Sequence, residues 1–249
     1  MSKELKPIIS VNGLVAKYGE KTVLDGISVD ILPGEVTVIL GGSGCGKTTL
    51  LKNILRLHEP FAGSVKFWGE DVLNMEEHEF GNILKKTGML FQNGALLNSI
   101  SIYENVSIPL ELHTKLPKEI IDRIIRVKLH LVNLSEATFK LPSELSGGMK
   151  KRAALARAIA MDPQILFCDE PSAGLDPLTS ASLDELILDL KKQLNMTIVI
   201  VTHELASIHR IADKIIFLDG GKMLFCGTLD AAKKAAIPAI DTFFEVGKF

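Results

Sequence analysis

The sequence predicts an α/β protein in which helices cover a mainly parallel β-sheet. The runs at 36–40, 165–168 and 197–201 are apolar almost throughout, which is typical of strands buried on both faces. A fourth run at 215–218 has the same character. Helical patterns lie between such runs, and the clearest one covers Thr179 to Leu194, where apolar residues share one face and charged residues stay outside.

Three regions depart from this pattern. Alternating strands at 8–15 and 27–31, with a further strand at 64–68, predict an antiparallel β subdomain near the N-terminus. The sequence Asp219-Gly220-Gly221-Lys222 predicts the turn of a hairpin. Helical periodicity dominates residues 88–160, which we therefore interpret as a helical subdomain.

Composition limits the functions that the chain can have. Its 249 residues carry 28 Lys and Arg against 30 Asp and Glu, and 47% are apolar, which fits a folded domain and excludes general disorder. A net charge of −2 argues against sequence-blind nucleic-acid binding. No apolar stretch approaches the roughly 20 residues that span a bilayer, and residues 1–7 have no apolar signal core, so we expect a soluble cytosolic chain. We expect a single domain at 7–241 and a tail at 242–249.

Cysteine and aromatic residues give weaker indications. Cys45, Cys168 and Cys226 are odd in number and widely spaced, which predicts neither a disulfide framework nor a metal site. The tail contains Phe243, Phe244 and Phe249, which we expect to pack on their own subunit rather than on another protein.

A phosphate-binding loop follows the strand that ends at Leu40. The residues Gly41-Gly42-Ser43-Gly44-Cys45-Gly46-Lys47-Thr48 fit G-x-x-x-x-G-K-[ST], and a helical run from Thr49 to Leu57 comes next. Glycines let the backbone N–H groups turn toward an anion at the positive end of the helix. Lys47 then supplies a positive charge to the β and γ phosphates, and the Thr48 hydroxyl can ligate Mg²⁺. An ordinary glycine-rich turn is the alternative, which the flanking strand and helix disfavour; Cys45 is a small residue that the loop tolerates.

Two adjacent carboxylates end the run at 165–168. The alternation of a strand would aim Asp169 and Glu170 in different directions, so that they can serve two roles. Asp169 can hold the Mg²⁺ shell while Glu170 orients the attacking water or acts as general base. Such a pair on its own is more often a helix cap or a solvated pair, but the phosphate loop upstream favours the catalytic interpretation.

Two further polar residues follow predicted strands. His203 comes after 197–201, at the strand end where α/β sheets bind ligands, and its side chain can hydrogen-bond a γ-phosphate. Gln92 comes after Met89-Leu90-Phe91 and can reach metal and water. A purely structural role is an equal alternative for both residues.

A second anion site precedes another helix. Leu145-Ser146-Gly147-Gly148-Met149 leads into a helical run from Lys150 to Ala160. One chain with two half-sites for one nucleotide indicates that each half meets its complement on a partner. This arrangement resembles the ATP-binding cassette ATPases, whose nucleotide lies between the phosphate loop of one subunit and the signature of the other. The resemblance covers residues 7–230, with the motifs in the family's order. Lys150, Lys151, Arg152 and Arg157 on this helix have the usual pattern of a solvated face.

The resemblance implies a P-loop NTPase (RecA-like) core and a role for each matching residue. Tyr18 matches the aromatic that stacks on adenine, although an edge or core aromatic is the commoner role for such a residue. Met149 departs from the family's usual glutamine, with little expected consequence because serine and glycine backbone contact the phosphate. The other matches are Gly41, Gly42, Ser43, Gly44, Cys45, Gly46, Lys47, Thr48 and Thr49 with the Walker A loop and its helix; Gln92 with the Q-loop; Ser146, Gly147 and Gly148 with the signature; Asp169 and Glu170 with Walker B; Ala173-Gly174-Leu175-Asp176 with the D-loop; and His203 with the switch histidine. It implies catalytic roles for Glu170, His203, Gln92 and Lys47, and magnesium ligation by Thr48, Gln92 and Asp169.

A narrower resemblance concerns the segments 91–97, 141–149 and 152–160, which are similar to Mla-type cassettes. These ATPases energise phospholipid transport between bacterial membranes and maintain outer-membrane lipid asymmetry. The resemblance implies a homodimer on the cytoplasmic face of the inner membrane, with an integral membrane permease (MlaE-like), an MCE-domain lipid-binding protein and a small auxiliary subunit as partners. Gly94-Ala95-Leu96-Leu97 would form the floor of the groove for the permease's coupling helix; subdomain core is the alternative.

The function expected from the sequence is therefore hydrolysis of Mg·ATP by a closing homodimer that drives a permease. Alternatives are a cassette for another cargo, such as amino acids or lipoproteins, and a soluble cassette ATPase without a permease. Long coiled-coil insertions and a second cassette, typical of relatives that act on nucleic acid or ribosomes, are not found in this sequence. A P-loop kinase or GTPase would not explain the signature helix, and the sequence contains no N-K-x-D motif.

Overall fold

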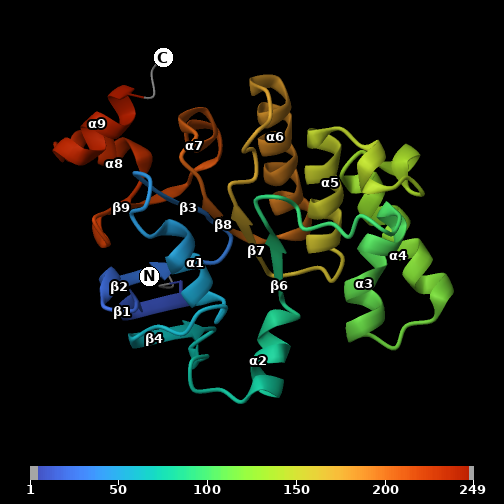
Figure 1. Cartoon of the computed structure of the whole chain (residues 1–249), viewed down its shortest axis with the longest axis horizontal. Helices are drawn as coiled ribbons and strands as arrows, with labels where there is room; N and C mark the ends of the chain where they lie inside the picture. Colours follow the sequence, from blue (N-terminus) through green and yellow to red (C-terminus); the bar gives the residue numbers. More distant parts are fainter. Residues whose placement is uncertain (1–4, 247–249) are drawn as a thin grey trace. The chain divides into compact units, whose positions relative to one another are not determined.

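The computed structural model describes residues 5–246 and divides the chain into two compact units (Figure 1). The first unit comprises the described residues up to Ile83 and from Val199 onward, and the second is Leu84–Ile198. The expectations for residues 1–4 and for Phe249 fall outside the described residues. Among those described, no helix is both long and apolar enough to cross a membrane.

An antiparallel sheet forms the N-terminal part of the first unit, as predicted. Its strand order is β2-β1-β4-β5, and Ile9 of β1 pairs with Ile31 on one side and Phe67 on the other. Alternation explains its exposure pattern, because the apolar side chains of β2 from Leu24 onward are buried while its polar residues face outward. The strands are β1 (Ile9–Tyr18), β2 (Lys21–Ile31), β4 (Ala62–Phe67) and β5 (Glu70–Asp71).

The remaining strands of the first unit are mainly parallel. Every residue of β3 (Val36–Gly41) is buried, and β3 runs parallel to β9 (Lys214–Asp219). β9 continues through the predicted glycine turn into β10 (Lys222–Gly227), which pairs with it antiparallel. β8 (Thr197–Val201) enters this unit at Val199, and the N–H of Thr202 just after it donates to the Ile39 carbonyl at 3.2 Å. The strand order here is β10-β9-β3-β8.

The helices of the first unit include α9, the last one in the part of the chain that the structure describes. Phe243 lies edge-on to the Phe217 ring of β9 at 5.5 Å, and Phe244 lies 5.9 Å from the His209 ring. The expectation that the tail packs on its own subunit is thus confirmed for these two phenylalanines. The helices are α1 (Lys47–Ile54), α2 (Glu77–Leu84, whose last residue belongs to the second unit), α7 (Leu205–Ile211), α8 (Leu229–Lys234) and α9 (Pro238–Val246).

The second unit combines a parallel strand pair with helices. β6 (Thr87–Leu90) pairs in parallel with β7 (Ile165–Asp169), whose residues are buried up to Cys168. Helices α3, α4 and α5 pack on one another, as Figure 1 shows, and form the predicted helical region. The helical elements are α3 (Ile102–His113), α4 (Lys118–Leu131), two 3₁₀ turns at Ser135–Ala137 and Pro142–Glu144, α5 (Gly147–Ala158) and α6 (Pro177–Leu194).

Three predicted helices begin earlier than expected. α6 begins at Pro177 rather than Thr179, because Asp176 is its N-cap. α1 begins at Lys47 rather than Thr49, because Gly46 adopts a left-handed conformation with φ 106° and starts the helix there. It ends at Ile54, since Arg56 has φ 50° and leaves the helix. α5 begins at Gly147 rather than Lys150, because Ser146 is already its N-cap.

Candidate functional site

The loop from β3 to α1 depends on glycine at two positions. Gly41 has φ 145°, and a Cβ there would lie 2.0 Å from the Leu218 carbonyl oxygen. Gly46 has φ 106°, and a Cβ there would lie 2.5 Å from Leu24 Cδ2. The loop therefore runs too close to its neighbours for any side chain at these points. Ser43, Gly44 and Thr48 are exposed, so the loop presents its outer surface to a ligand.

Positive charge gathers at this loop. Lys47 Nζ donates hydrogen bonds to the carbonyls of Gly41 and Gly42, both at 2.9 Å. No acidic residue occupies the first turn of α1, so nothing in that turn offsets the positive end of the helix. The loop therefore has the character of an anion site. Cys45 is buried, and burial raises the pKa of its thiol. Cys45 thus fills space as a neutral thiol and is not a reactive thiolate.

Two other predicted residues belong to the first unit. His203 is exposed and follows the buried Thr202, whose hydroxyl accepts a hydrogen bond from the N–H of Glu204 at 3.1 Å. Tyr18 ends β1, is 46% exposed, and lies 4.6 Å from the ring of His58. The ring of Tyr18 is therefore at an edge rather than in the core.

The two carboxylates after β7 differ in backbone conformation. Asp169 is the last residue of the strand, whereas Glu170 has a left-handed backbone with φ 46°. The predicted alternation therefore does not extend to Glu170, because the chain has already turned. A left-handed glutamate is strained and persists only where its surroundings hold it. The Glu170 carbonyl accepts a hydrogen bond from the N–H of Ala173 at 3.2 Å, and both carboxylate residues are half-buried.

The predicted signature forms the start of α5. Ser146 caps the helix by accepting a hydrogen bond from the Met149 N–H at 3.3 Å. This contact uses the backbone of Met149, so its unusual side chain leaves the cap intact. Ser146 and Gly147 are exposed, and the first turn of α5 contains no acidic residue. The start of α5 is thus exposed and carries no acidic residue that would repel an anion, and its role as a second anion site stays a prediction.

Asp176, in the predicted D-loop, holds Thr179 of α6 beside the predicted signature. Asp176 caps α6, accepting hydrogen bonds from the Thr179 N–H at 3.0 Å and the Thr179 hydroxyl at 2.5 Å. These hydrogen bonds lower the pKa of Asp176. They fix Thr179 where its Cγ2 would lie 2.6 Å from a Cβ on Gly148. Residue 148 must therefore be small because of its contact with Thr179, which is distant in the sequence.

The predicted solvated face of α5 is wrong for three of its four basic residues. Lys151 is only 7% exposed, and its ammonium donates to the carbonyls of Gln92 and Glu170. Arg157 donates to the carbonyls of Gly94 and Ala95 at 2.7 and 2.8 Å, and burial lowers the pKa of its guanidinium. Arg152 donates to the Val132 carbonyl and the Ser182 hydroxyl. Lys150 alone of the four is exposed.

The segment after Gln92 is partly core and partly surface. Gln92 is exposed, whereas Gly94 is buried, and a Cβ on Gly94 would lie 3.2 Å from Ala154 Cβ. Leu97 is 51% exposed, and its N–H donates to Asn105 Oδ1 at 2.8 Å. Gly94 therefore belongs to the core of the second unit, whereas Leu97 lies at the surface, and the groove for a coupling helix stays a prediction.

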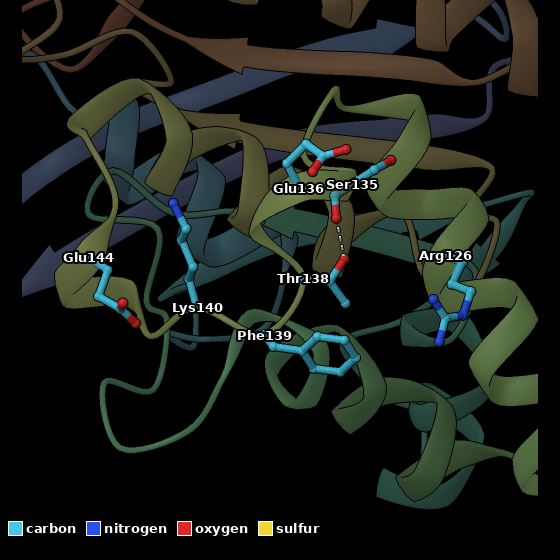
Figure 2. Close-up of a pocket in the computed structure, with 7 residues that line it drawn as sticks. All are labelled: Arg126, Ser135, Glu136, Thr138, Phe139, Lys140 and Glu144. Carbon is cyan, nitrogen blue, oxygen red and sulfur yellow. Dashed lines mark hydrogen bonds between the residues drawn. The ribbon is translucent and has the colours of Figure 1, made fainter.

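A cavity of about 360 Å³ lies elsewhere in the second unit (Figure 2). The Thr138 hydroxyl at this cavity donates to the Ser135 carbonyl at 2.6 Å. None of the predicted site residues lines it. Its lining residues are Arg126, Ser135, Glu136, Thr138, Phe139, Lys140 and Glu144.

The predicted residues suit a magnesium nucleotide. The loop at 41–48 is shaped by Gly41 and Gly46, whose positions admit no side chain, and a glycine-rich backbone of this kind suits anion binding. The Thr48 hydroxyl, the Gln92 amide and the Asp169 carboxylate offer oxygen ligands, which Mg²⁺ prefers. The loop, Tyr18 and His203 belong to the first unit, and the other predicted residues belong to the second.

Comparison with known proteins identifies relatives along most of the chain. A family model described as "ABC transporter" matches residues 24–173. The intermembrane phospholipid transport system ATP-binding protein MlaF of Haemophilus influenzae is 41% identical over 89% of this chain and 84% of its own length. A probable ribonucleotide transport ATP-binding protein, mkl of Mycobacterium leprae, is 39% identical over 94% of this chain and 68% of its own length.

Solved structures share the fold. CbiO1 from Clostridium perfringens, part of the ABC transporter complex cbiONQ, superposes with a TM-score of 0.83 at 29% identity, covering 96% of this chain and 99% of that one. The dimeric post-hydrolysis state of the ATP-binding cassette MJ0796, bound to ADP and Pi, gives a TM-score of 0.80 at 28% identity, covering 89% and 98%.

Proposed function

Because the chain belongs to the ABC transporter family and is an ATPase of that family, we propose that it powers phospholipid transport between bacterial membranes. The observation that carries the cargo assignment is the 41% identity to a phospholipid transport ATPase over 89% of the chain. The mycobacterial relative named for ribonucleotide transport is 39% identical, so the cargo needs a direct test.

The phosphate loop holds the nucleotide. The backbone of residues 41–49 surrounds the phosphates, Lys47 supplies a positive charge, and the edge ring of Tyr18 stacks on adenine. Thr48, Gln92 and Asp169 would hold Mg²⁺, which neutralises phosphate charge when it is bound.

The protein contributes mainly by positioning the reacting groups, because phosphoryl transfer to water needs little covalent chemistry from protein side chains. Glu170 orients the attacking water and takes up its proton. In this proposal His203 donates a hydrogen bond to the γ-phosphate, and the Gln92 side chain contacts both the metal and the attacking water. The strained backbone of Glu170 supports its assignment, because such strain gathers at functional sites.

A second copy completes each site. Ser146, Gly147 and Gly148 of one copy contact the γ-phosphate held by Lys47 of the other. The exposed start of α5, without acidic residues in its first turn, supports this role. The dimeric form of the MJ0796 cassette supports it as well.

The partner in the membrane is an integral permease of the MlaE type. The structurally similar CbiO1 is part of an ABC transporter complex, which supports a permease partner for this chain. The exposed end of residues 94–97 offers an apolar surface for its coupling helix. An MCE-domain lipid-binding protein and a small auxiliary subunit complete the proposed assembly on the cytoplasmic face of the inner membrane. Residues 7–241 form the ATPase domain, with a helical subdomain at 88–160 and a tail at 242–249.

The catalytic assignment is tested with Glu170→Gln. ATP affinity should stay close to wild type while turnover falls by about 10²-fold, because the water loses its base. Gel filtration with ATP should then show a trapped dimer. Glu185→Gln, an exposed glutamate on α6, is the matched control. Wild-type turnover in Glu170→Gln would remove Glu170 from this role.

The cargo assignment is tested on the complete transporter. The permease that co-purifies with this chain should carry phospholipid, measured by mass spectrometry of extracted lipid. ATP should drive lipid transfer between labelled vesicles, and Glu170→Gln should abolish it. ATP-driven uptake of ribonucleotides without lipid transfer would overturn the assignment.

A further inference from the structure

Lys151 lies inside the second unit, one turn beyond the start of α5. Its side chain is 7% exposed, whereas the neighbouring Lys150 is exposed. The Lys151 ammonium donates to the Gln92 carbonyl in a short contact and to the Glu170 carbonyl at 3.3 Å. One buried charge thus joins the backbones of two proposed catalytic residues.

Burial of an ammonium is costly unless hydrogen-bond acceptors replace its water. Carbonyl oxygens suit this purpose, because an ammonium offers three donors and accepts nothing. The position of Lys151 is therefore coupled to these two carbonyls. Movement of either backbone segment away from α5 would weaken the contacts of a buried charge.

The contact matters most at Glu170. The left-handed conformation of this residue, with φ 46°, persists only where its surroundings determine it. The Glu170 carbonyl accepts from the Ala173 N–H at 3.2 Å and from the Lys151 ammonium at 3.3 Å. These two donors orient the peptide plane that follows Glu170 and so hold the backbone from which its carboxylate extends.

We propose that Lys151 is a positioning residue for ATP hydrolysis, and that its ammonium fixes the backbones of Gln92 and Glu170 to the signature helix α5. The proposal rests on the proposed function, since it assumes the roles given to Ser146, Gln92 and Glu170. When the start of α5 binds the nucleotide of a second copy, any shift of the helix is passed through Lys151 to the backbone of the water-orienting Glu170. Hydrolysis is then sensitive to dimer closure.

The test replaces Lys151 with methionine, which keeps the length of the side chain and removes the donors. In the purified full chain, kcat should fall by about 10- to 100-fold, the range expected when a catalytic group is misplaced. The ATP Kd should stay within about twofold, because Lys151 is outside the phosphate loop. Lys151→Arg should retain most of kcat. Lys150→Met, at the exposed neighbour, should match wild type in both quantities.

A double-mutant cycle separates positioning from general stability. If Lys151 acts through Glu170, then Lys151→Met should lower the residual turnover of Glu170→Gln far less than it lowers wild-type turnover. A merely structural loss would reduce both backgrounds by the same factor, and that result would overturn the proposal. Thermal unfolding of each variant shows whether it is folded.

The catalytic role of Glu170 and the positioning role of Lys151 can be overturned separately. Wild-type turnover in Glu170→Gln would overturn the proposed catalytic role itself. A large loss in Glu170→Gln combined with wild-type kcat in Lys151→Met would overturn only the role of Lys151. Should Lys151→Met not fold, Lys151→Gln replaces it, because its uncharged and shorter side chain stays polar but cannot reach both carbonyls as the ammonium does. A reduced kcat at unchanged Kd in that variant supports the proposal, and an unchanged kcat contradicts it.

Discussion

Gly148→Ala should force the signature helix against α6. The added methyl would lie 2.6 Å from Thr179 Cγ2, whereas ordinary contacts begin at 3.4 Å. Thr179 cannot easily retreat, because its N–H and hydroxyl both donate to Asp176, at 3.0 and 2.5 Å. Either the cap of α6 or the start of α5 must therefore shift.

The loss of stability expected for Gly148→Ala follows from two opposing effects. Overpacking of this kind costs about 1–3 kcal/mol. Replacing a helical glycine by alanine returns at most about 1 kcal/mol, and less so close to the helix start. A net loss of about 1–2 kcal/mol corresponds to a fall in Tm of about 2–8 °C for a chain of this length.

Thr179→Ser supplies the matched rescue, because it deletes Cγ2 and keeps the hydroxyl bound to Asp176. Tm should be measured without nucleotide for the wild type, both single variants and the double variant. The double variant should recover most of the loss, with a coupling free energy of at least about 1 kcal/mol. Additive effects, within about 0.5 kcal/mol, would refute the close contact as the reason for glycine at 148.

The other predictions concern the phosphate loop, the cap of α6, and the metal. Lys47→Ala should weaken ATP binding in an equilibrium titration by about tenfold or more, while Lys52→Ala, exposed on the same helix, should not; normal affinity in Lys47→Ala would count against the loop assignment. Gly41→Ala should lower Tm and abolish ATP binding, because its Cβ would lie 2.0 Å from a carbonyl oxygen; a stable, ATP-binding variant would contradict that geometry. Hydrogen bonds lower the folded-state pKa of Asp176 below 3.8, so its stabilisation is present above that pH and is lost as the pH falls through the folded pKa. The difference in Tm between wild type and Asp176→Asn should therefore be constant near neutral pH and shrink below about pH 4, and a difference that grows on acidification would show the sign to be wrong. Removal of divalent metal with EDTA should abolish ATP hydrolysis, and added Mg²⁺ should restore it, while the Tm of the nucleotide-free protein stays unchanged. Hydrolysis without divalent metal would exclude the proposed ligands.

The sequence predicts those parts of the fold that local pattern controls. Buried strands such as β3 and β8 are apolar throughout and are recognisable without any partner. The loop at 41–48 is predictable for the same reason, since its residues are adjacent along the chain. Both predictions are confirmed at the level of the fold.

Features that depend on contacts between distant residues cannot be predicted from local sequence pattern. Lys150 and Lys151 are identical in type and adjacent, yet one is exposed and the other buried. Two of the groups that Lys151 contacts are the backbone carbonyls of Gln92 and Glu170, which leave no mark in the sequence. The turn at Glu170 is similarly hidden, because a left-handed glutamate replaces the glycine that would have signalled it.

In the proposed dimer each ATP site combines the phosphate loop of one copy with the signature of another. Mixing two inactive variants shows whether the two copies share their sites in this way. Lys47→Ala disables the loop, and Gly147→Glu places a carboxylate beside the partner's phosphate without crowding, since the nearest atom to its Cβ is Leu175 Cδ2 at 3.4 Å. The account predicts that the mixture hydrolyses ATP faster than the two variants measured separately, because mixed dimers contain one intact site. A mixture no more active than its components, or Gly147→Glu alone at the wild-type rate, would contradict it.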